Sequence, residues 1–440
     1  MSSSAKSALL VLLMACADPA LAAQAAADMP TAPARHPAEI IYEQAVATAT
    51  SADWPAYLDA TGRALVLAPG QPALQRRHAE ALAQLGRDDE AMTMLRSLAG
   101  WGVEVKFADF ELLAPLRDRA DWPQLLAAAE AALTPQGAPA HSFTMPAADL
   151  IPEGICHDPV DDVFYVSSVA QRKILRVTRD GTASDFIAPG AHGYLAGLGV
   201  AVDAPRRRLW AVSTAQADDG LFDAATVATS AVHVFDLTTG DLLWRHVTAQ
   251  HDSLGFNDVC VLPDGGAAVA VSDRGQVLRF GPDGGAPAAL TPPGSVPGAN
   301  GLCVGPRGDC LYVSAYLLGI MRVDLGDGAV SAAAVPGANF TTSGVDGLYL
   351  LPGGDGLIAV QNFLGLDRVA RFRLRADGLI DDCRVLTARQ EMFVDPTTGA
   401  IAADGFHFIA DSYVSPFYGR KDKAVLTGFG RTRVMRVGLE

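Results

Sequence analysis

The stretch Ala299-Asn300-Gly301-Leu302-Cys303 and the turn Gly305-Pro306-Arg307-Gly308 that follows it decide the fold of this chain. A polar residue and a glycine precede a short apolar run, and a second apolar run begins after the turn at Leu311. Gly and Pro mark tight turns, whereas short runs of apolar and aromatic residues mark strands. The stretch therefore predicts the start of an antiparallel β-meander.

The same unit occurs six times after residue 142, with openings roughly 43 to 59 residues apart. The openings are Glu153-Gly154-Ile155-Cys156, Leu198-Gly199-Val200-Ala201, Asn257-Asp258-Val259-Cys260, Asn300-Gly301-Leu302-Cys303, Asp346-Gly347-Leu348-Tyr349 and Thr398-Gly399-Ala400-Ile401. Most units contain a third run with an Arg between apolar residues, as in Ile320-Met321-Arg322-Val323, and we expect a structural role for that Arg. Repeats of this length are typical of the four-stranded blades of a β-propeller.

The last unit ends at Glu440 without room for a fourth strand. The segment His141-Ser142-Phe143-Thr144-Met145, just before the first unit, is free to supply that strand and to close the ring, which removes exposed strand edges. We therefore predict a mainly β protein in which residues 142–440 form a six-bladed β-propeller.

Residues 38–134 have a helical pattern, with Ala-rich stretches that carry apolar residues at three- and four-residue spacing. The stretch His78–Ala99 resembles a tetratricopeptide repeat, a paired-helix unit whose small residues let helices approach closely. We expect a small all-α helical-repeat domain here, joined to the propeller by a linker at residues 135–141. This domain would either dock a protein partner in a groove or cap the propeller.

Residues 1–22 have the pattern of an export signal: Lys6, an apolar run from Ala8 to Ala15, and an A-x-A cleavage site at Ala20-Leu21-Ala22. A periplasmic or secreted protein is therefore expected. Leu13-Met14-Ala15-Cys16 loosely resembles a lipoprotein box, so a lipid anchor at Cys16 is the alternative. No later stretch is long and apolar enough to predict a membrane span.

The composition narrows the class of protein. Half of the residues are apolar and 19% are charged, which is typical of a globular chain, and the formal net charge of −15 argues against a nucleic-acid partner. Cys16 falls in the signal, which leaves an odd number of the six cysteines. Cys156, Cys260 and Cys303 lie at equivalent positions and are expected to be buried; whether Cys303 pairs with Cys310 stays open.

The first strand of a propeller blade lies innermost, so the six opening residues are expected to converge at one mouth of the central channel. Four of the six carry carboxylate or amide oxygens: Glu153, Asn257, Asn300 and Asp346. Calcium takes six to eight such hard oxygen ligands, and water and substrate would complete the set. A lone Asn-Gly or Asp-Gly usually marks only a turn, but four donors at equivalent positions favour a site for one divalent ion, calcium.

Around these residues the chain resembles a known family. Pro152-Glu153-Gly154-Ile155, Phe256-Asn257-Asp258, Ala299-Asn300-Gly301-Leu302 and Val345-Asp346-Gly347-Leu348 are similar to the metal-site motifs of the SMP-30/gluconolactonase/LRE-like propellers. The resemblance covers nearly all of residues 143–439 and none of the helical region. It implies that the four residues bind a divalent ion, usually calcium, with manganese and zinc as alternatives. The wider superfamily includes lactonases, esterases and a C–C bond-forming synthase, so the resemblance is weak for substrate.

The resemblance implies a calcium-dependent hydrolase that acts on a small-molecule lactone or related ester, and the signal pattern of residues 1–22 adds that the enzyme is exported. An ion would polarise the carbonyl and lower the pKa of a bound water. Asp346 would take a proton from that water or act as a ligand only, and His192, in the loop before blade two, is a second candidate base or a solvated loop residue. Gluconolactonases hold sugar hydroxyls with an Arg that has no evident counterpart here. The alternative functions are a non-catalytic docking platform with a structural calcium ion and a synthase-like propeller that has lost hydrolysis.

The second strands return to the same mouth, where their last residues are expected to line a substrate pocket or to cap turns: Ser168, Thr214, Asp273, Tyr316, Asn362 and Asp411. Insertions at residues 215–230 and 412–431 rise from that mouth. The second contains Tyr413, Phe417, Tyr418, Arg420, Lys421 and Lys423. This cluster would either orient a carboxylate-bearing substrate or form a solvated loop.

Overall fold

The computed structural model describes residues 35–216, 220–249, 255–420, 422 and 428–440. The predicted export signal, residues 1–22, and the alternative anchor Cys16 lie outside the described residues. No helix in the described ranges has both the length and the apolar character of a membrane span.

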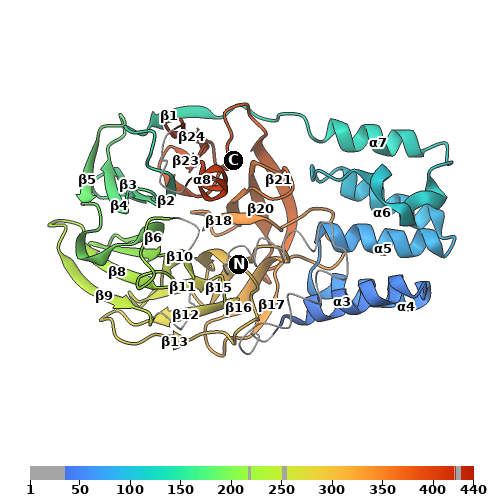
Figure 1. Ribbon diagram of the computed structural model, residues 1–440, viewed down its shortest axis with the longest axis horizontal. Helices are drawn as coiled ribbons and strands as arrows, with labels where there is room; N and C mark the ends of the chain where they lie inside the picture. The colour runs from blue at the N-terminus through green and yellow to red at the C-terminus, as the bar shows by residue number, and fades with distance from the viewer. Residues whose placement is uncertain (1–34, 217–219, 250–254, 421, 423–427) are drawn as a thin grey trace.

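Six four-stranded antiparallel sheets form a ring, which confirms the predicted six-bladed propeller (Figure 1). Blades one and two consist of β2 (Pro152–Asp158), β3 (Val163–Ser168), β4 (Lys173–Val177), β5 (Ala183–Ile187), β6 (Ala196–Asp203), β7 (Arg208–Thr214), β8 (Ser230–Asp236) and β9 (Leu242–Val247). Blades three and four consist of β10 (Phe256–Val261), β11 (Ala267–Val271), β12 (Gln276–Phe280), β13 (Ala288–Ala289), β14 (Ala299–Val304), β15 (Cys310–Ala315), β16 (Gly319–Asp324) and β17 (Val330–Ala332). Blade five consists of β18 (Val345–Leu350), β19 (Gly356–Gln361), β20 (Arg368–Leu374) and β21 (Ile380–Ala388).

Blade six joins the two ends of the propeller sequence. Its sheet has the order β1-β24-β23-β22, with β1 (Ala140–Thr144), β22 (Gly399–Ala402), β23 (Gly405–Ile409) and β24 (Arg433–Val437). Strand β1 pairs antiparallel with β24, where Phe143 lies opposite Val434. The segment before blade one therefore supplies the missing fourth strand, as predicted.

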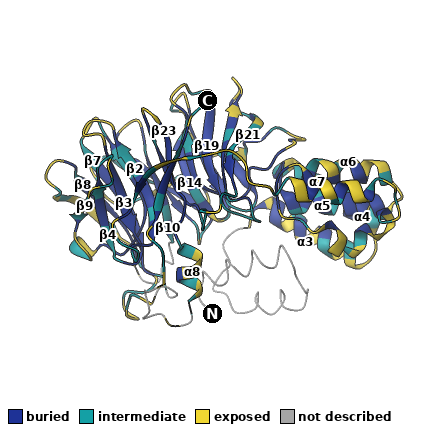
Figure 2. Cartoon of the chain, turned by 90° about the horizontal axis from the view of Figure 1, so that it is seen from above, coloured by how far each residue is buried: buried dark blue, intermediate teal, exposed yellow. Residues whose placement is uncertain are grey.

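The second strand of each blade is buried on both of its faces. Every residue of β3, β11 and β19 is buried, because neighbouring blades pack face to face around the ring. This packing explains why these strands have continuous apolar runs rather than the alternation of a half-exposed sheet. Figure 2 shows the buried residues concentrated in the strands of the ring.

The helical region extends from one side of the propeller (Figure 1) and consists of α3 (Pro37–Thr50), α4 (Trp54–Leu67), α5 (Pro72–Gln84), α6 (Asp88–Ala99) and α7 (Trp122–Ala131), with short 3-10 helices η1 (Phe107–Asp109) and η2 (Glu111–Leu116). A proline at the first or second position starts α3, α4, α5 and α7, where its missing N–H costs no helical hydrogen bond. Consecutive helices pack against one another. The tetratricopeptide resemblance and the proposed domain boundaries stay predictions.

The helices share a hydrophobic core with the propeller. Tyr42 and Leu74 belong to one buried cluster with Leu302 and Met321 of blade four, and Leu366 of blade five belongs to the core of the helical region. The five cysteines among the described residues are all free, so Cys303 and Cys310 do not form a disulfide. Cys260 and Cys303 are buried, as predicted, whereas Cys156 is half-buried.

Candidate metal centre

Each predicted metal ligand lies at an irregularity between the first and second strands of its blade. In blade one, Pro152 pairs with Ser168 and the next paired residue is Ile155, so Glu153 and Gly154 fall outside the regular ladder. The same shift in register spans Asn257, Asn300 and Asp346 in blades three, four and five. Bulges of this kind redirect a side chain and recur next to functional sites. The four predicted ligands therefore share one local backbone feature, which blade two repeats at Leu198.

Glycine follows three of these ligands because neighbouring innermost strands nearly touch around the axis. A Cβ atom on Gly154 would overlap the carbonyl oxygen of Leu198, and one on Gly301 would overlap the carbonyl oxygen of Asp346. Neither glycine has a positive φ among the described residues. Their role is therefore close approach between blades rather than turn formation.

Hydroxyl groups connect five of the six pairs of neighbouring blades at the same level. In four of them, a hydroxyl in or just after the second strand of one blade donates to a first-strand carbonyl of its neighbour: Ser167 Oγ to Leu198 at 2.5 Å, Thr214 Oγ1 to Phe256 at 2.9 Å, Ser272 Oγ to Ala299 at 2.6 Å and Ser314 Oγ to Val345 at 2.7 Å. Between blades six and one, Thr398 Oγ1 donates to the Glu153 carbonyl at 2.5 Å. These bonds fix the backbone that carries the predicted ligands.

The negative charges of Glu153 and Asp346, two of the predicted ligands, are not balanced by positive charges of the described residues. Oε2 of Glu153 is shielded from solvent and has no hydrogen-bond partner. Burial raises the pKa of Glu153 well above its ordinary value, and the charges of Asp346 and Asp395 raise it further. Burial also raises the pKa of Asp346 to about 6, although hydrogen bonds from Asn362 and Asn300 oppose the increase. Within the described ranges, neither carboxylate forms an ion pair with an Arg or a Lys.

These observations fit a bound cation. Buried carboxylates are stable only when they are paired, protonated or bound to a metal. In the described part of the chain, no three His, Cys, Asp or Glu side chains are grouped closely enough to hold a metal by themselves. A metal at this position would therefore depend on amide oxygens from Asn257 and Asn300 in addition to the carboxylates, which is a donor set suited to calcium.

Asp395 is a carboxylate of this site that the sequence interpretation missed. It lies in the loop between β21 and β22, where its Oδ2 accepts a hydrogen bond of 3.0 Å from the Ser415 backbone N–H. Its charge raises the pKa of both Glu153 and Asp346. The repeat pattern pointed to Thr398 as the opening residue of blade six, but the acidic group lies three residues earlier in the chain.

Asn362 and Tyr316 hold Asp346 in place. Asn362 Nδ2 donates to Asp346 Oδ2 at 2.7 Å and to the Pro396 carbonyl at 3.0 Å, and the Tyr316 hydroxyl donates to Asn362 Oδ1 at 2.7 Å. Burial and the nearby charge of Asp346 raise the pKa of Tyr316, so its hydroxyl remains a proton donor. Both residues were expected to line this mouth. Asp411, another expected residue, instead pairs with Arg433 at 2.6 Å.

His192 lies at the outer edge of blade two. It belongs to the short 3-10 helix η3 (Ala191–Gly193), and its carbonyl accepts a 2.7 Å hydrogen bond from Arg245 in the outermost strand β9. Its exposed ring packs 6.0 Å from the ring of Phe235 in β8. The predicted ligands lie on innermost strands, so the structure does not bring His192 together with them. Asn300 forms a hydrogen bond with Asp346, and the charge of Asp346 acts on Glu153. Asn257 shares only the equivalent bulge with these residues.

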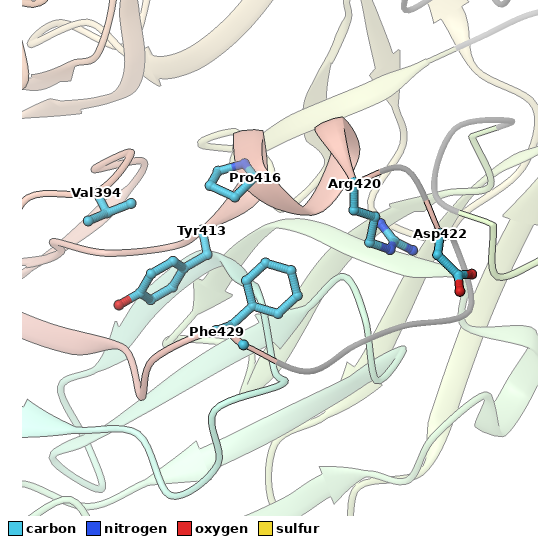
Figure 3. A pocket seen from close by; sticks show the side chains of 7 residues that line it. Val394, Tyr413, Pro416, Arg420, Asp422 and Phe429 are labelled. Atoms are coloured by element: carbon cyan, nitrogen blue, oxygen red, sulfur yellow. The ribbon is translucent and has the colours of Figure 1, made fainter.

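A cavity of 510 Å³ is lined by Val394, which precedes Asp395 in the chain (Figure 3). Its lining residues are Val394, Tyr413, Pro416, Arg420, Asp422, Gly428 and Phe429. Most belong to the second insertion, which forms helix α8 (Val414–Gly419) and buries Phe417 completely. The described part of this insertion is therefore packed against the propeller and is not a solvated loop; Lys421 and Lys423 lie outside the described residues.

Comparison with solved structures identifies other propellers. The chain is 17% identical to a gluconolactonase of Xanthomonas campestris, with 69% of this chain and 99% of that chain covered and a TM-score of 0.43. It is 16% identical to the calcium-binding protein regucalcin of Agrobacterium tumefaciens, with coverage of 67% and 92% and a TM-score of 0.42. It is 14% identical to virginiamycin B lyase of Staphylococcus aureus, with 60% of this chain and 79% of that chain covered and a TM-score of 0.42. No protein-family profile and no curated protein sequence matches the chain, and structural similarity at this level does not assign a reaction.

Proposed function

We propose that this protein is a hydrolase of lactones or related esters that uses one divalent ion, calcium, at the mouth of the propeller. The observation that carries the proposal is a pair of carboxylates that no Arg or Lys of the described residues neutralises: the shielded Oε2 of Glu153 has no hydrogen-bond partner, and burial raises the pKa of Asp346. Glu153, Asn257, Asn300 and Asp346 would hold the ion. Two carboxylates neutralise its charge, two amide oxygens add hard donors, and water and substrate complete the coordination.

When bound, such an ion polarises an ester carbonyl and lowers the pKa of a nearby water. The chain supplies the remaining chemistry. Asp346 is the proposed general base: burial raises the pKa of this carboxylate in the metal-free protein, and a bound cation would lower it again, so the group would be ionised at neutral pH and able to accept a proton from attacking water. Asn362 orients Asp346 through Oδ2, and Tyr316 in turn orients Asn362. His192 has no role in this mechanism because it lies at the outer edge of blade two.

The lining of the cavity next to Val394 and Asp395 suggests which kind of substituent the substrate has next to its ester bond. Tyr413 and Phe429 have ring centroids 6.1 Å apart, and Val394 and Pro416 add apolar surface (Figure 3). Arg420, whose guanidinium lies 3.6 Å from the ring of Phe417, contributes a positive charge to the same lining. We therefore favour an ester or lactone with an apolar substituent over a sugar lactone, whose hydroxyls need polar partners.

A second candidate function is a binding platform in which calcium has a structural role only. Two apolar side chains on the outer helices support this candidate: Ile40 on α3 is 43% exposed and Val66 on α4 is 65% exposed. These side chains would contact a protein partner. Export to the periplasm or the medium is a separate proposal that rests on the signal pattern of residues 1–22.

Hydrolysis assays separate these candidates. We would measure turnover of γ-, δ- and aldono-lactones and of an aryl ester, with calcium and after chelation, for the wild type, Asp346→Ala, Asn300→Ala and His192→Ala. The proposal expects turnover that chelation removes, large losses in the first two variants and none in His192→Ala. Absence of turnover across the panel, with calcium still raising the melting temperature, would support the platform instead.

A further inference from the structure

Two loops of blade five carry residues of the candidate metal centre. The loop at residues 362–367 begins with Asn362, which holds Asp346, and the loop at residues 389–398 contains Asp395. Two hydrogen bonds join the loops: the Arg389 N–H donates to the Asp367 carbonyl at 2.9 Å, and Asn362 Nδ2 donates to the Pro396 carbonyl at 3.0 Å. The loops therefore form one unit at the edge of the site.

The far side of the first loop is packed into the helical region. Leu366 is fully buried in the hydrophobic cluster that contains Leu98, Trp101 and Phe107 of that region. The Glu104 N–H donates to the Leu364 carbonyl at 2.8 Å. The propeller loop that begins with Asn362 is thus anchored, through Leu366, in the hydrophobic core of the helical region.

The second loop is held by an arginine that binds the ends of two helices. The Arg389 guanidinium donates to the Ala132 carbonyl at the end of α7, at 3.2 Å, and to the Gly102 carbonyl just after α6. The unpaired carbonyls at helix C-termini favour a positive charge. Arg389 also interacts with two carboxylates, Asp367 of the first loop and Glu104 of the helical region. The side chain therefore connects both helices with both loops.

We propose that the helical region is a structural part of the metal centre, with Arg389 as the positioning residue that sets Asn362 and Asp395 through the two loops. This inference rests on the proposed function, because it states what the helices do for that same site. It also gives a function to the helical region, which contains none of the metal-site motifs. Supporting groups behind metal ligands commonly change metal affinity tenfold or more when they are removed.

Binding of terbium, a luminescent substitute for calcium that nearby Tyr316 can sensitise, tests the inference in the full-length, metal-free protein. We expect Arg389→Ala and Leu366→Ala to weaken terbium affinity about tenfold, and calcium affinity equally when calcium competes. Arg389→Lys keeps the charge but presents a single donor group, so we expect a loss of about threefold. Should Arg389→Ala fail to fold, Arg389→Lys provides the same test.

Asn339→Ala is the matched control. Asn339 Oδ1 accepts a 3.3 Å hydrogen bond from Trp101 Nε1 and another from Ser97, so it also joins the helices to the propeller, but through a different loop. Its terbium affinity should stay within twofold of the wild type. The inference is overturned if the Arg389 variants bind like the wild type, or if Asn339→Ala loses as much affinity. Wild-type protein that binds no terbium overturns the metal centre as well, whereas binding without hydrolysis overturns only the proposed reaction.

Discussion

The carboxylates at the two ends of strand β2 differ in whether the chain supplies them with a partner. Asp158, at the end of the strand that lies at the opposite mouth of the channel (the outer end), is fully buried and pairs with Arg207 at 2.7 Å. Glu153, at the end that lies at the mouth with the other predicted ligands (the axial end), has a carboxylate oxygen that is shielded from solvent and has no hydrogen-bond partner. The same contrast holds around the ring: Asp264, Asp355 and Asp404, in the turns after the first strands, each pair with the third-strand Arg of their blade.

This difference is informative because both carboxylates belong to the same repeated unit, one at each end of its first strand. At the outer end the chain provides each of these four carboxylates with a cation, and the pKa of Asp404 falls well below its ordinary value since His407, Arg436 and Arg179 donate to it. At the axial end burial raises the pKa of Glu153 and Asp346 instead. We infer that the axial carboxylates are left for a cation from solution.

The largest expected effect comes from Asp346→Asn, which keeps the shape of the side chain and removes its charge. We expect kcat/KM for ester hydrolysis to fall about 1000-fold, because a proposed base and a metal ligand are lost together. Asp158→Asn tests the other end of the comparison. It should cost about 3 kcal/mol of unfolding free energy in urea, since Arg207 loses a buried partner, and leave kcat/KM of the folded protein nearly unchanged. Similar activity losses in both variants would contradict the distinction.

The second expected effect is a dependence of calcium binding on pH. The pKa of Asp346 is raised to about 6 in the folded, metal-free protein, from an ordinary value of 3.8. Ionisation of this group therefore costs stability as pH rises from about 4 to about 6, and the cost persists at higher pH. Calcium reverses that cost, so its affinity should increase over the same range, and Glu153 should extend the increase further.

Melting temperatures from pH 4 to 8, with calcium and with a chelator, measure this effect. The difference between the two curves should widen as pH rises, and Asp346→Asn should flatten it. A constant difference across the range would show that calcium does not compete with protons at these carboxylates.

A third experiment supplies the missing cation from the chain itself. Asn300 forms a hydrogen bond with Asp346, so Asn300→Lys should place an ammonium group beside that carboxylate. We expect the melting temperature of the metal-free protein to rise by a few degrees, corresponding to about 1 kcal/mol, and the calcium response to disappear. Asn300→Ala is the control, which should lose calcium affinity without the gain in stability. A gain that calcium still increases would mean that the ion binds elsewhere.

The repeat made the fold predictable, because six apolar units with the same turn signals allow few other architectures. The closing strand was also predictable, since Phe143 and its neighbours are the one segment left for it before blade one. The placement of Glu153, Asn300 and Asp346 on neighbouring innermost strands was predictable for the same reason, because equivalent positions in a ring meet at its axis; their role as metal ligands stays a prediction. Asp395 was not, because it lies in a loop whose length differs from that of the other blades. His192 was expected at the same mouth, but it lies beside the outermost strand of blade two. The sequence does not show how far a loop extends from the axis.

The smallest expected effect is that of Asp404→Asn at the outer end of blade six. The pKa of Asp404 is lowered in the folded state, so its ion pairs contribute stability above its ordinary pKa, and that contribution is lost as the pH falls. Its side chain is 42% exposed, so solvent screens the interaction and we expect a loss of only about 1 kcal/mol at pH 7 in urea unfolding. Calcium affinity should not change, because the site at the other end of the ring does not use this residue. A weaker calcium affinity in Asp404→Asn would mean that the two ends of the blades are coupled, and the unbalanced axial charge alone would no longer explain binding.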